Sequence, residues 1–208
     1  GSGYSFAALG GDDFVTGTPE NDTLNGGAGD DTLQPDIGFD SIIGGDGTDR
    51  LSFANLDKSV WVSLSLRTLA PPNSLVSYLG RTDGSEELNF AGRATSVEEN
   101  EGTAYDDWFF STQLDEAFYL GDGNDTVRDG SAALGSSDTI DGGAGDGDII
   151  DYSTQSSVKL VADFTKYDDQ IAKLTVNEQN ILNTGIAVTN DTAINIEGII
   201  GSPNDDSI

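Results

Sequence analysis

The sequence predicts an all-β protein assembled from short, repeated strands. Three observations predict this class. An aspartate and an aliphatic residue recur in a register of nine residues, 27 of the 208 residues are glycine, and helical periodicity is weak throughout. Short strands joined by glycine-containing turns, rather than long amphipathic elements, are therefore expected to make the fold.

Five consecutive nonapeptides form the first array, over residues 8–52. Its best copies are GGAGDDTLQ at 26–34 and GGDGTDRLS at 44–52. With aspartate at position six, the markers of the five copies are Asp13, Asp22, Asp31, Asp40 and Asp49. The aliphatic residue at position eight predicts a three-residue strand with one inward side chain, because neighbouring residues of a strand face opposite sides. Two nonapeptides would complete one coil of eighteen residues, so turns on the same flank are two repeats apart.

A second array occupies residues 102–150, and its best copy is LGDGNDTVR at 120–128. The register is interrupted by a four-residue insertion and, in the last copy, by one extra residue. Its markers are Asp107, Glu116, Asp125, Asp138 and Asp148. Residues 201–208, GSPNDDSI, are interpreted as the start of a truncated third array.

The segments that follow the arrays, 53–101 and 151–200, also resemble each other, which indicates a tandem unit of about ninety to a hundred residues. In the first segment Val60, Val62, Leu64 and Leu66 alternate with other residues, the pattern of a strand with one buried face. Residues 69–92 are rich in Pro and Gly and lack a clear period, so they are interpreted as an excursion from the array. Residues 1–7 are interpreted as a tag scar or N-terminal tail.

Composition excludes several classes of function. With 9 basic and 37 acidic residues the formal charge is −28, which disfavours nucleic acid or an anionic membrane as a partner. No stretch is apolar enough for membrane insertion. Cysteine and histidine are both absent, so zinc sites, disulfides and imidazole or thiol catalysis are excluded. Adjacent carboxylates occur without a partnered nucleophile, so we expect no enzyme activity and no catalytic residues.

The repeated turn has the chemistry of a calcium site. Glycine allows positive backbone dihedral angles and close approach, which exposes carbonyl oxygens, and the aspartate adds an anionic oxygen. Calcium accepts six to eight such oxygens in flexible geometry, whereas magnesium requires a strict octahedron. The alternative is that these residues are ordinary solvated acidic turns. The repeated phase of two arrays favours calcium over that alternative.

These motifs resemble the repeats of RTX proteins (repeats-in-toxin, with hemolysin-type calcium-binding nonapeptides), a family of large secreted bacterial proteins. The resemblance implies a parallel β-roll (β-solenoid) in two tandem units with additional flanking strands, and about six Ca2+ ions, three per roll. It pairs Asp13 with Asp31, Asp31 with Asp49, and Asp22 with Asp40 in the first roll. In the second roll it pairs Asp107 with Asp125, Asp125 with Asp148, and Glu116 with Asp138. The full set of implied metal ligands is Asp13, Asp22, Gly27, Gly29, Asp31, Asp40, Gly45, Gly47, Asp49, Asp107, Glu116, Gly121, Gly123, Asp125, Asp138, Gly143, Gly145 and Asp148.

The resemblance implies two alternative functions. The favoured one is a calcium-dependent folding module of a large secreted or cell-surface protein exported by type I secretion, with an adhesin as the specific role. The alternative is an accessory module of a secreted carbohydrate-active or hydrolytic enzyme, such as an alginate epimerase, lipase or metalloprotease. Calcium ions are the expected partners, with extracellular polysaccharide or neighbouring repeats of the parent chain as further candidates. Many similar units in the parent chain would indicate the adhesin, and few units beside a catalytic domain the accessory module.

Overall fold

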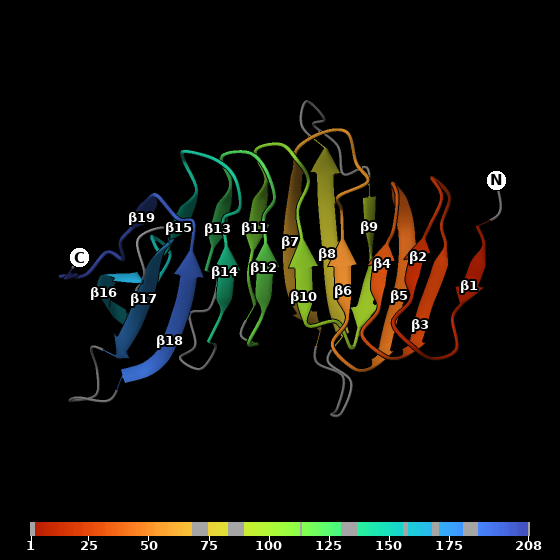
Figure 1. Cartoon of the computed structure of the whole chain (residues 1–208), viewed down its shortest axis with the longest axis horizontal. Helices are drawn as coiled ribbons and strands as arrows, with labels where there is room; N and C mark the ends of the chain where they lie inside the picture. The colour runs from red at the N-terminus through yellow and green to blue at the C-terminus, as the bar shows by residue number, and fades with distance from the viewer. Residues whose placement is uncertain are drawn as a thin grey trace. The chain divides into compact units, whose positions relative to one another are not determined.

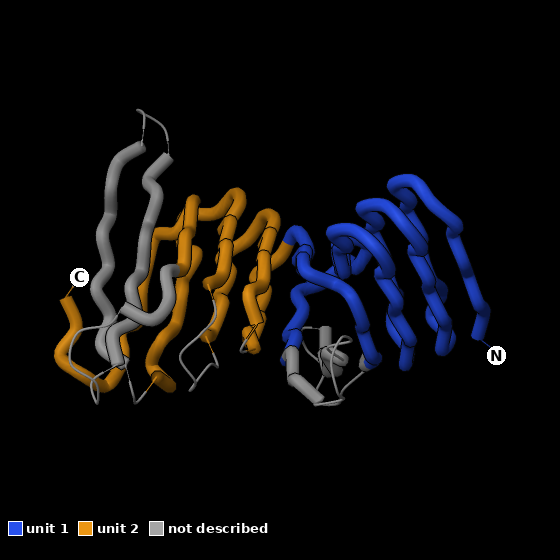
Figure 2. Tube along the Cα trace, turned by 90° about the horizontal axis from the view of Figure 1, so that it is seen from below, with its two compact units in different colours: residues 1–104 blue, residues 105–208 orange. Residues whose placement is uncertain are grey.

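A computed structural model describes residues 3–67, 75–82, 90–112, 114–129, 137–155, 158–167, 171–180 and 187–207. These residues form strands and turns without α-helix, which confirms the predicted all-β class. None of the described residues forms a helix long and apolar enough to cross a membrane. The chain divides into two compact units, unit 1 with residues 1–104 and unit 2 with residues 105–208 (Figure 2).

In unit 1 the chain alternates between two sheets, in which the strands of successive coils pair in parallel. The strands are β1 (Ser5–Ala7), β2 (Phe14–Thr16), β3 (Thr23–Ala28), β4 (Thr32–Gln34), β5 (Gly38–Asp46), β6 (Arg50–Ser52), β7 (Val60–Arg67), β8 (Leu75–Thr82), β9 (Phe90–Thr95) and β10 (Glu99–Glu101). One sheet pairs β1, β3, β5 and β9 in parallel, and the other pairs β2, β4, β6 and β10 in parallel (Figure 1). Because Leu24 pairs with Ile42 and Val15 with Leu33, the coil advances by eighteen residues, as the nonapeptide register predicts.

The flanking segment of unit 1 makes an antiparallel detour within one sheet. Strand β7 pairs antiparallel with β8, and β8 pairs antiparallel with β9, which then lies parallel to β5. Part of the expected excursion at 69–92 therefore forms strands, because its backbone hydrogen bonds are satisfied by β7 and β9. Residues 69–74 and 83–89, which belong to the same prediction, lie outside the described residues.

Unit 2 repeats this plan. Its strands are β11 (Trp108–Phe110), β12 (Ala117–Tyr119), β13 (Thr126–Arg128), β14 (Thr139–Asp141), β15 (Ile149–Asp151), β16 (Val158–Tyr167), β17 (Ile171–Asn180), β18 (Ala187–Ile194) and β19 (Gly198–Ile200). Strands β11, β13, β15 and β19 pair in parallel, as do β12, β14 and β18. Strands β16, β17 and β18 form the antiparallel detour, so β18 returns to the roll as β9 does in unit 1.

Each roll has a thin core of one large side chain per strand. The fully or almost fully buried members include Leu24, Leu33, Ile42, Leu51, Phe53, Phe109, Phe118, Val127, Ile140, Ile150 and Tyr152. Val60 and Val62 are buried while Trp61 between them is 38% exposed, which agrees with a strand that buries one face. The side chains of Leu64 and Leu66 lie outside the described residues. The acidic marker residues of the turns are buried beside this core, among them Asp31, Asp49, Asp125 and Asp148.

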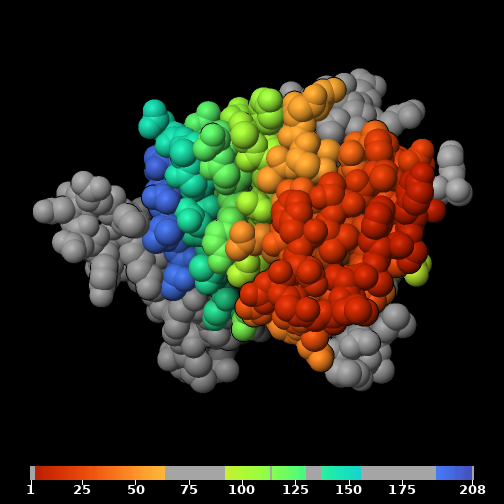
Figure 3. Space-filling view, turned by 45° about the vertical axis from the view of Figure 1, so that its right-hand side comes forward, coloured from red at the N-terminus to blue at the C-terminus, as the bar shows by residue number. Residues whose placement is uncertain are grey.

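The N-terminal residues depart from the sequence prediction. Ser5–Ala7 form β1, which pairs in register with Thr23–Asn25 of β3, so this part of the expected tail belongs to the first roll. The reason is that Phe6 stands opposite Leu24, eighteen residues or one coil further along the chain. The space-filling view shows the coils of the first roll packed into one continuous surface (Figure 3).

Candidate calcium centre

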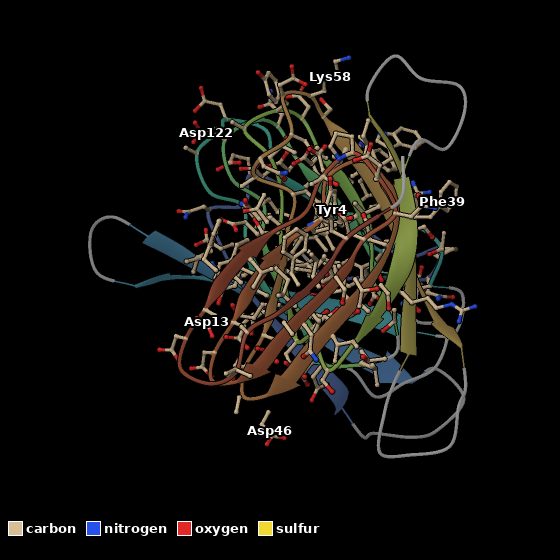
Figure 4. All side chains as sticks on the ribbon, turned by 90° about the vertical axis from the view of Figure 1, so that its right-hand side faces the viewer. Tyr4, Asp13, Phe39, Asp46, Lys58 and Asp122 are labelled. Atoms are coloured by element: carbon tan, nitrogen blue, oxygen red, sulfur yellow. The ribbon has the colours of Figure 1, made fainter. Side chains whose placement is uncertain are left out.

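On one flank of unit 1, acidic residues of successive coils are linked into a carboxylate ladder. The backbone N–H of Asp13 donates to Oδ1 of Asp31 at 2.8 Å, and the N–H of Asp31 donates to Oδ1 of Asp49 at 2.9 Å. Each carboxylate therefore accepts a hydrogen bond from the coil before it, eighteen residues earlier. Asp13 and Asp46, from two turns of this flank, lie at the same edge of the unit in Figure 4.

The other flanks carry the same ladder. The N–H of Asp22 donates to Asp40 at 2.7 Å in unit 1. In unit 2 the corresponding bonds run from Asp107 to Asp125, from Asp125 to Asp148 and from Glu116 to Asp138, at 2.7 to 3.0 Å. The structure thus brings together all six of the pairs expected from the sequence. Their role as metal ligands stays a prediction.

In five carboxylates of the ladders, one of the two oxygens has no hydrogen-bond partner. Their Oδ2 atoms are buried and have no hydrogen-bond partner, in Asp31, Asp40, Asp49, Asp125 and Asp148. None of the five takes part in the ion pairs Arg50–Glu99 and Arg128–Asp151. A buried anionic oxygen without a partner is costly, so these atoms indicate a cation-binding role.

Glycines of the turns let carbonyl oxygens approach the same places. Gly27, Gly29, Gly45 and Gly47 all have φ between +113° and +135°, a region that side chains rarely adopt. A Cβ on Gly45 would overlap the Gly27 carbonyl oxygen, and one on Gly47 would overlap that of Gly29. Only glycine therefore permits consecutive turns to stack this closely.

The glycines of unit 2 follow the same plan. Gly121, Gly123 and Gly143 have positive φ, whereas Gly145 lies outside the left-handed region. Nevertheless a Cβ on Gly143 would overlap the Gly121 carbonyl oxygen, and one on Gly145 would overlap that of Gly123. Each of these carbonyls faces the turn of the following coil.

The donor set fits a hard divalent cation. It consists only of carboxylate and carbonyl oxygens, the ligands that calcium prefers. Within the described residues no three acidic side chains converge on one point, so carbonyl oxygens must supply most ligands of any ion. The gaps between stacked glycine turns are where both kinds of oxygen meet.

The same turns match a known family. A family model of the RTX calcium-binding nonapeptide repeat, with four copies, matches residues 8–41 and 36–55. Residues 8–55 carry RTX calcium-binding nonapeptide repeats. These repeats identify calcium as the cation, and the matched residues contain the ladder of Asp13, Asp31 and Asp49. The second array at 102–150 lies outside the matched residues, so its RTX character stays a prediction, which its ladder and its glycine turns support. No curated protein matches the chain.

Not every turn of the RTX rolls has this chemistry. The Oδ2 atom of Asp22 accepts hydrogen bonds from the N–H and hydroxyl of Thr18, at 2.6 and 2.8 Å, and Oδ1 accepts one from the N–H of Tyr4. Burial would raise the pKa of Asp22, but these hydrogen bonds together lower it below its usual value. We call such a turn, closed by a Thr donor, a capped turn. Asp22 has protein donors for both oxygens, although the repeat makes it equivalent to Asp31.

A second capped turn lies in unit 2. The N–H of Thr112 donates to Oε2 of Glu116 at 2.6 Å. The sequence contains the signal that distinguishes capped turns, because Thr18 stands where Gly27 stands in the best repeat. The predicted Asp22–Asp40 and Glu116–Asp138 pairs both begin at a capped turn, so one carboxylate of each pair already has donors from its own turn.

Three acidic residues of the ladders were not predicted from the RTX repeats. Glu98 accepts the N–H of Asp49 at 3.0 Å, and Glu197 accepts the N–H of Asp148 at 2.8 Å. Asp191 accepts the N–H of Asp138 at 2.9 Å and the Tyr152 hydroxyl at 2.7 Å. All three follow a detour, so their spacing of 49 or 53 residues hides them from a nine-residue register.

Burial raises the pKa of several ladder carboxylates. It raises the pKa of Asp125 to about 8, with repulsion from Asp107 and Asp148 adding to the shift. It raises the pKa of Asp138 to about 9, with Asp191 and Glu116 as the charged neighbours. The pKa of Glu116 rises to about 7, even though its bonds to Thr112 act in the opposite direction. In the absence of a cation, the folded rolls therefore favour the protonated, neutral form of Asp125 and Asp138 at neutral pH, and ionising these groups there is unfavourable.

These shifts predict an inverted pH dependence for the calcium-free protein. A carboxylate whose pKa is higher in the folded state binds more protons there, so the free energy of unfolding falls as pH rises from about 4 to about 9. We expect calcium-depleted protein to show more β structure by circular dichroism at pH 5 than at pH 8. With saturating calcium, ligands are held ionised, and the order should reverse because protons compete with the metal. A β signal of depleted protein that increases from pH 5 to pH 8 would contradict this interpretation.

Proposed function

We propose that this chain is a calcium-dependent folding module of a large secreted or cell-surface bacterial protein, with adhesion as its role. The observation that carries the proposal is the set of five buried Oδ2 atoms without a hydrogen-bond partner. In water these carboxylates are solvated, whereas in the metal-free roll they are desolvated next to each other. Calcium binding would remove this penalty only in the folded state, so binding free energy becomes folding free energy.

Low calcium would then keep the chain unfolded, and high calcium outside the cell would fold it. The formal charge of −28 also favours folding only after calcium binds, since self-repulsion opposes a compact state until cations bind. RTX repeat proteins are typically secreted, which is consistent with a switch between two calcium concentrations.

The repetition of one plan in two units supports an array rather than a single accessory domain. Each unit contains a roll followed by an antiparallel detour that returns to the roll. In both units an N–H to glutamate bond spans the same 49 residues. Such tandem units suit an extended surface protein that needs length, because each unit contacts only its neighbours in the chain.

The test is a calcium titration of chelator-treated protein followed by far-UV circular dichroism, with magnesium as the control. We expect a coil spectrum in chelator and a β spectrum in millimolar calcium, with magnesium unable to replace calcium because it keeps its waters. A β spectrum that is already present in chelator and does not change with calcium would contradict calcium-dependent folding.

A further inference from the structure

Each detour rejoins its roll at a tight corner. In unit 1, Thr95 pairs with Ile43 and the N–H groups of Glu98 and Glu99 both donate to the Asp49 carbonyl oxygen. The corner therefore uses two residues where the glycine turn opposite it uses five. Its first residue, Ser96, has φ of 51°, a left-handed conformation that is uncommon for a residue with a side chain.

Unit 2 has the same corner. Asn195 has φ of 54°, and the N–H groups of Glu197 and Gly198 both donate to the Asp148 carbonyl oxygen. A strained conformation that recurs at the corresponding place, with a different residue, is maintained by the structure around it. The strain therefore needs a physical reason common to both corners.

The common feature is a concentration of acceptor oxygens. A Cβ on Gly44 would overlap both the Ser96 carbonyl oxygen and the Oδ2 atom of Asp49. A Cβ on Gly142 would likewise overlap the Asn195 carbonyl oxygen and lie 2.8 Å from Oδ2 of Asp148. Asp49 and Asp148 are both fully buried, and these two Oδ2 atoms have no hydrogen-bond partner. Carbonyl and carboxylate oxygens thus face the same small space, where they repel each other.

A glutamate carboxylate completes each group. The Oε2 atom of Glu98 accepts the N–H of Asp49, and that of Glu197 accepts the N–H of Asp148. Both glutamates are otherwise exposed, so a second carboxylate oxygen stays accessible to an ion and to water.

We propose that each corner is an additional calcium site, formed by Asp49, the Ser96 carbonyl and Glu98 in unit 1 and by Asp148, the Asn195 carbonyl and Glu197 in unit 2. These sites rest on the proposed calcium function of the rolls and extend it to the detours. Calcium at the corner would fix the return strand, β9 or β18, to the roll. Folding of the detour then depends on the same ion that closes the ladder.

The test is the number of calcium ions bound per chain, measured by native mass spectrometry and by isothermal titration calorimetry. Glu98→Gln keeps an oxygen that can accept the Asp49 N–H but removes the charge, and Asp57→Asn removes one charge at an exposed position outside the ladders. We expect Glu98→Gln to bind one ion fewer than the wild type, Glu98→Gln/Glu197→Gln two fewer, and Asp57→Asn the same number. If both glutamine variants bind as many ions as the wild type with equal affinity, the glutamates only terminate the ladder and the proposal is wrong.

A second measurement needs no variant. In crystals of the calcium-loaded wild type, anomalous scattering should place an ion about 2.4 Å from Oδ2 of Asp49 and from the Ser96 carbonyl, a normal calcium–oxygen distance. Peaks between the glycine turns but not at the corners would overturn the corner sites and leave the proposed function intact. A wild type that binds no calcium at all would instead overturn the proposed function.

Discussion

Asp125→Asn is expected to change the free energy of unfolding in opposite directions with and without calcium. Without calcium, the wild type must either protonate Asp125, whose pKa burial raises to about 8, or keep a fully buried carboxylate ionised without a partner for Oδ2. The amide of asparagine is neutral and needs no proton, so we expect a gain on the order of 2 kcal/mol at pH 7.5, a size typical of changes at buried polar groups. With calcium, a ligand shared by two gaps of the ladder is lost, and the calcium midpoint should rise at least about tenfold, or about 1.4 kcal/mol.

The measurement is folding of wild type and variant by a stabilising osmolyte in chelator, and urea unfolding in saturating calcium, together with calcium titrations. Asp22→Asn is the matched control, since Asp22 already accepts three hydrogen bonds from Tyr4 and Thr18. An amide at Asp22 would direct N–H groups at those donors, so this variant should be less stable in both conditions. Loss of stability in chelator for Asp125→Asn would show that its orphaned oxygen imposes no penalty on the metal-free roll.

Gly45→Ala is expected to abolish the calcium-dependent folding of unit 1 at calcium concentrations that fold the wild type. Gly45 has φ of +132°, and an added Cβ would overlap the Gly27 carbonyl oxygen of the preceding turn. The left-handed backbone costs about 1–2 kcal/mol, and the overlap costs about 1–3 kcal/mol more or forces the stacked turns apart. Separation of the turns also breaks the arrangement of carbonyl oxygens that would surround an ion.

Gly11→Ala separates the two causes. Gly11 has φ of +100°, but an added Cβ there meets no atom within 4 Å. This variant should therefore show the backbone cost alone, with a small increase in the calcium midpoint. The comparison is made by hydrogen exchange of the β3 and β5 amides during calcium titration. Equal midpoints for the two variants would mean that close stacking of the turns contributes nothing to calcium binding.

The repeated part of the fold could be predicted because its signal is local. Asp31 and Asp49 are in register by eighteen residues, and the structure joins them through the expected flank. The detours could not be predicted in the same way, since pairing of β7, β8 and β9 depends on contacts among strands that carry no repeat. The LVSYLGRT sequence of β8 lacks alternation, so its strand character comes from its two neighbours rather than from its own pattern.

In the candidate calcium centre, too, some residues could be predicted from the repeat and others could not. The carboxylates inside each array follow from the nonapeptide period, whereas Glu98, Glu197 and Asp191 follow detours whose length hides their register. Capped turns were missed for another reason. The repeat pattern ranks Asp22 with Asp31 by position, but the hydroxyl of Thr18 supplies a hydrogen bond that a glycine cannot make. One residue at position two of the turn thus determines whether the carboxylate is satisfied by the protein.

The direction of the ladder bonds has a consequence for how sharply the protein responds to calcium. Each ladder carboxylate accepts an N–H from the preceding coil with one oxygen, and in the glycine turns the other oxygen is left for an ion. Neighbouring ions in such a ladder would share a carboxylate ligand. Binding of one ion would therefore fix a ligand of the next site and make binding there more favourable. A one-dimensional chain with nearest-neighbour coupling of this kind fills over a narrow range of ligand concentration. A modest difference in calcium across a membrane would then act as a threshold, below which a chain stays extended and above which whole rolls form cooperatively.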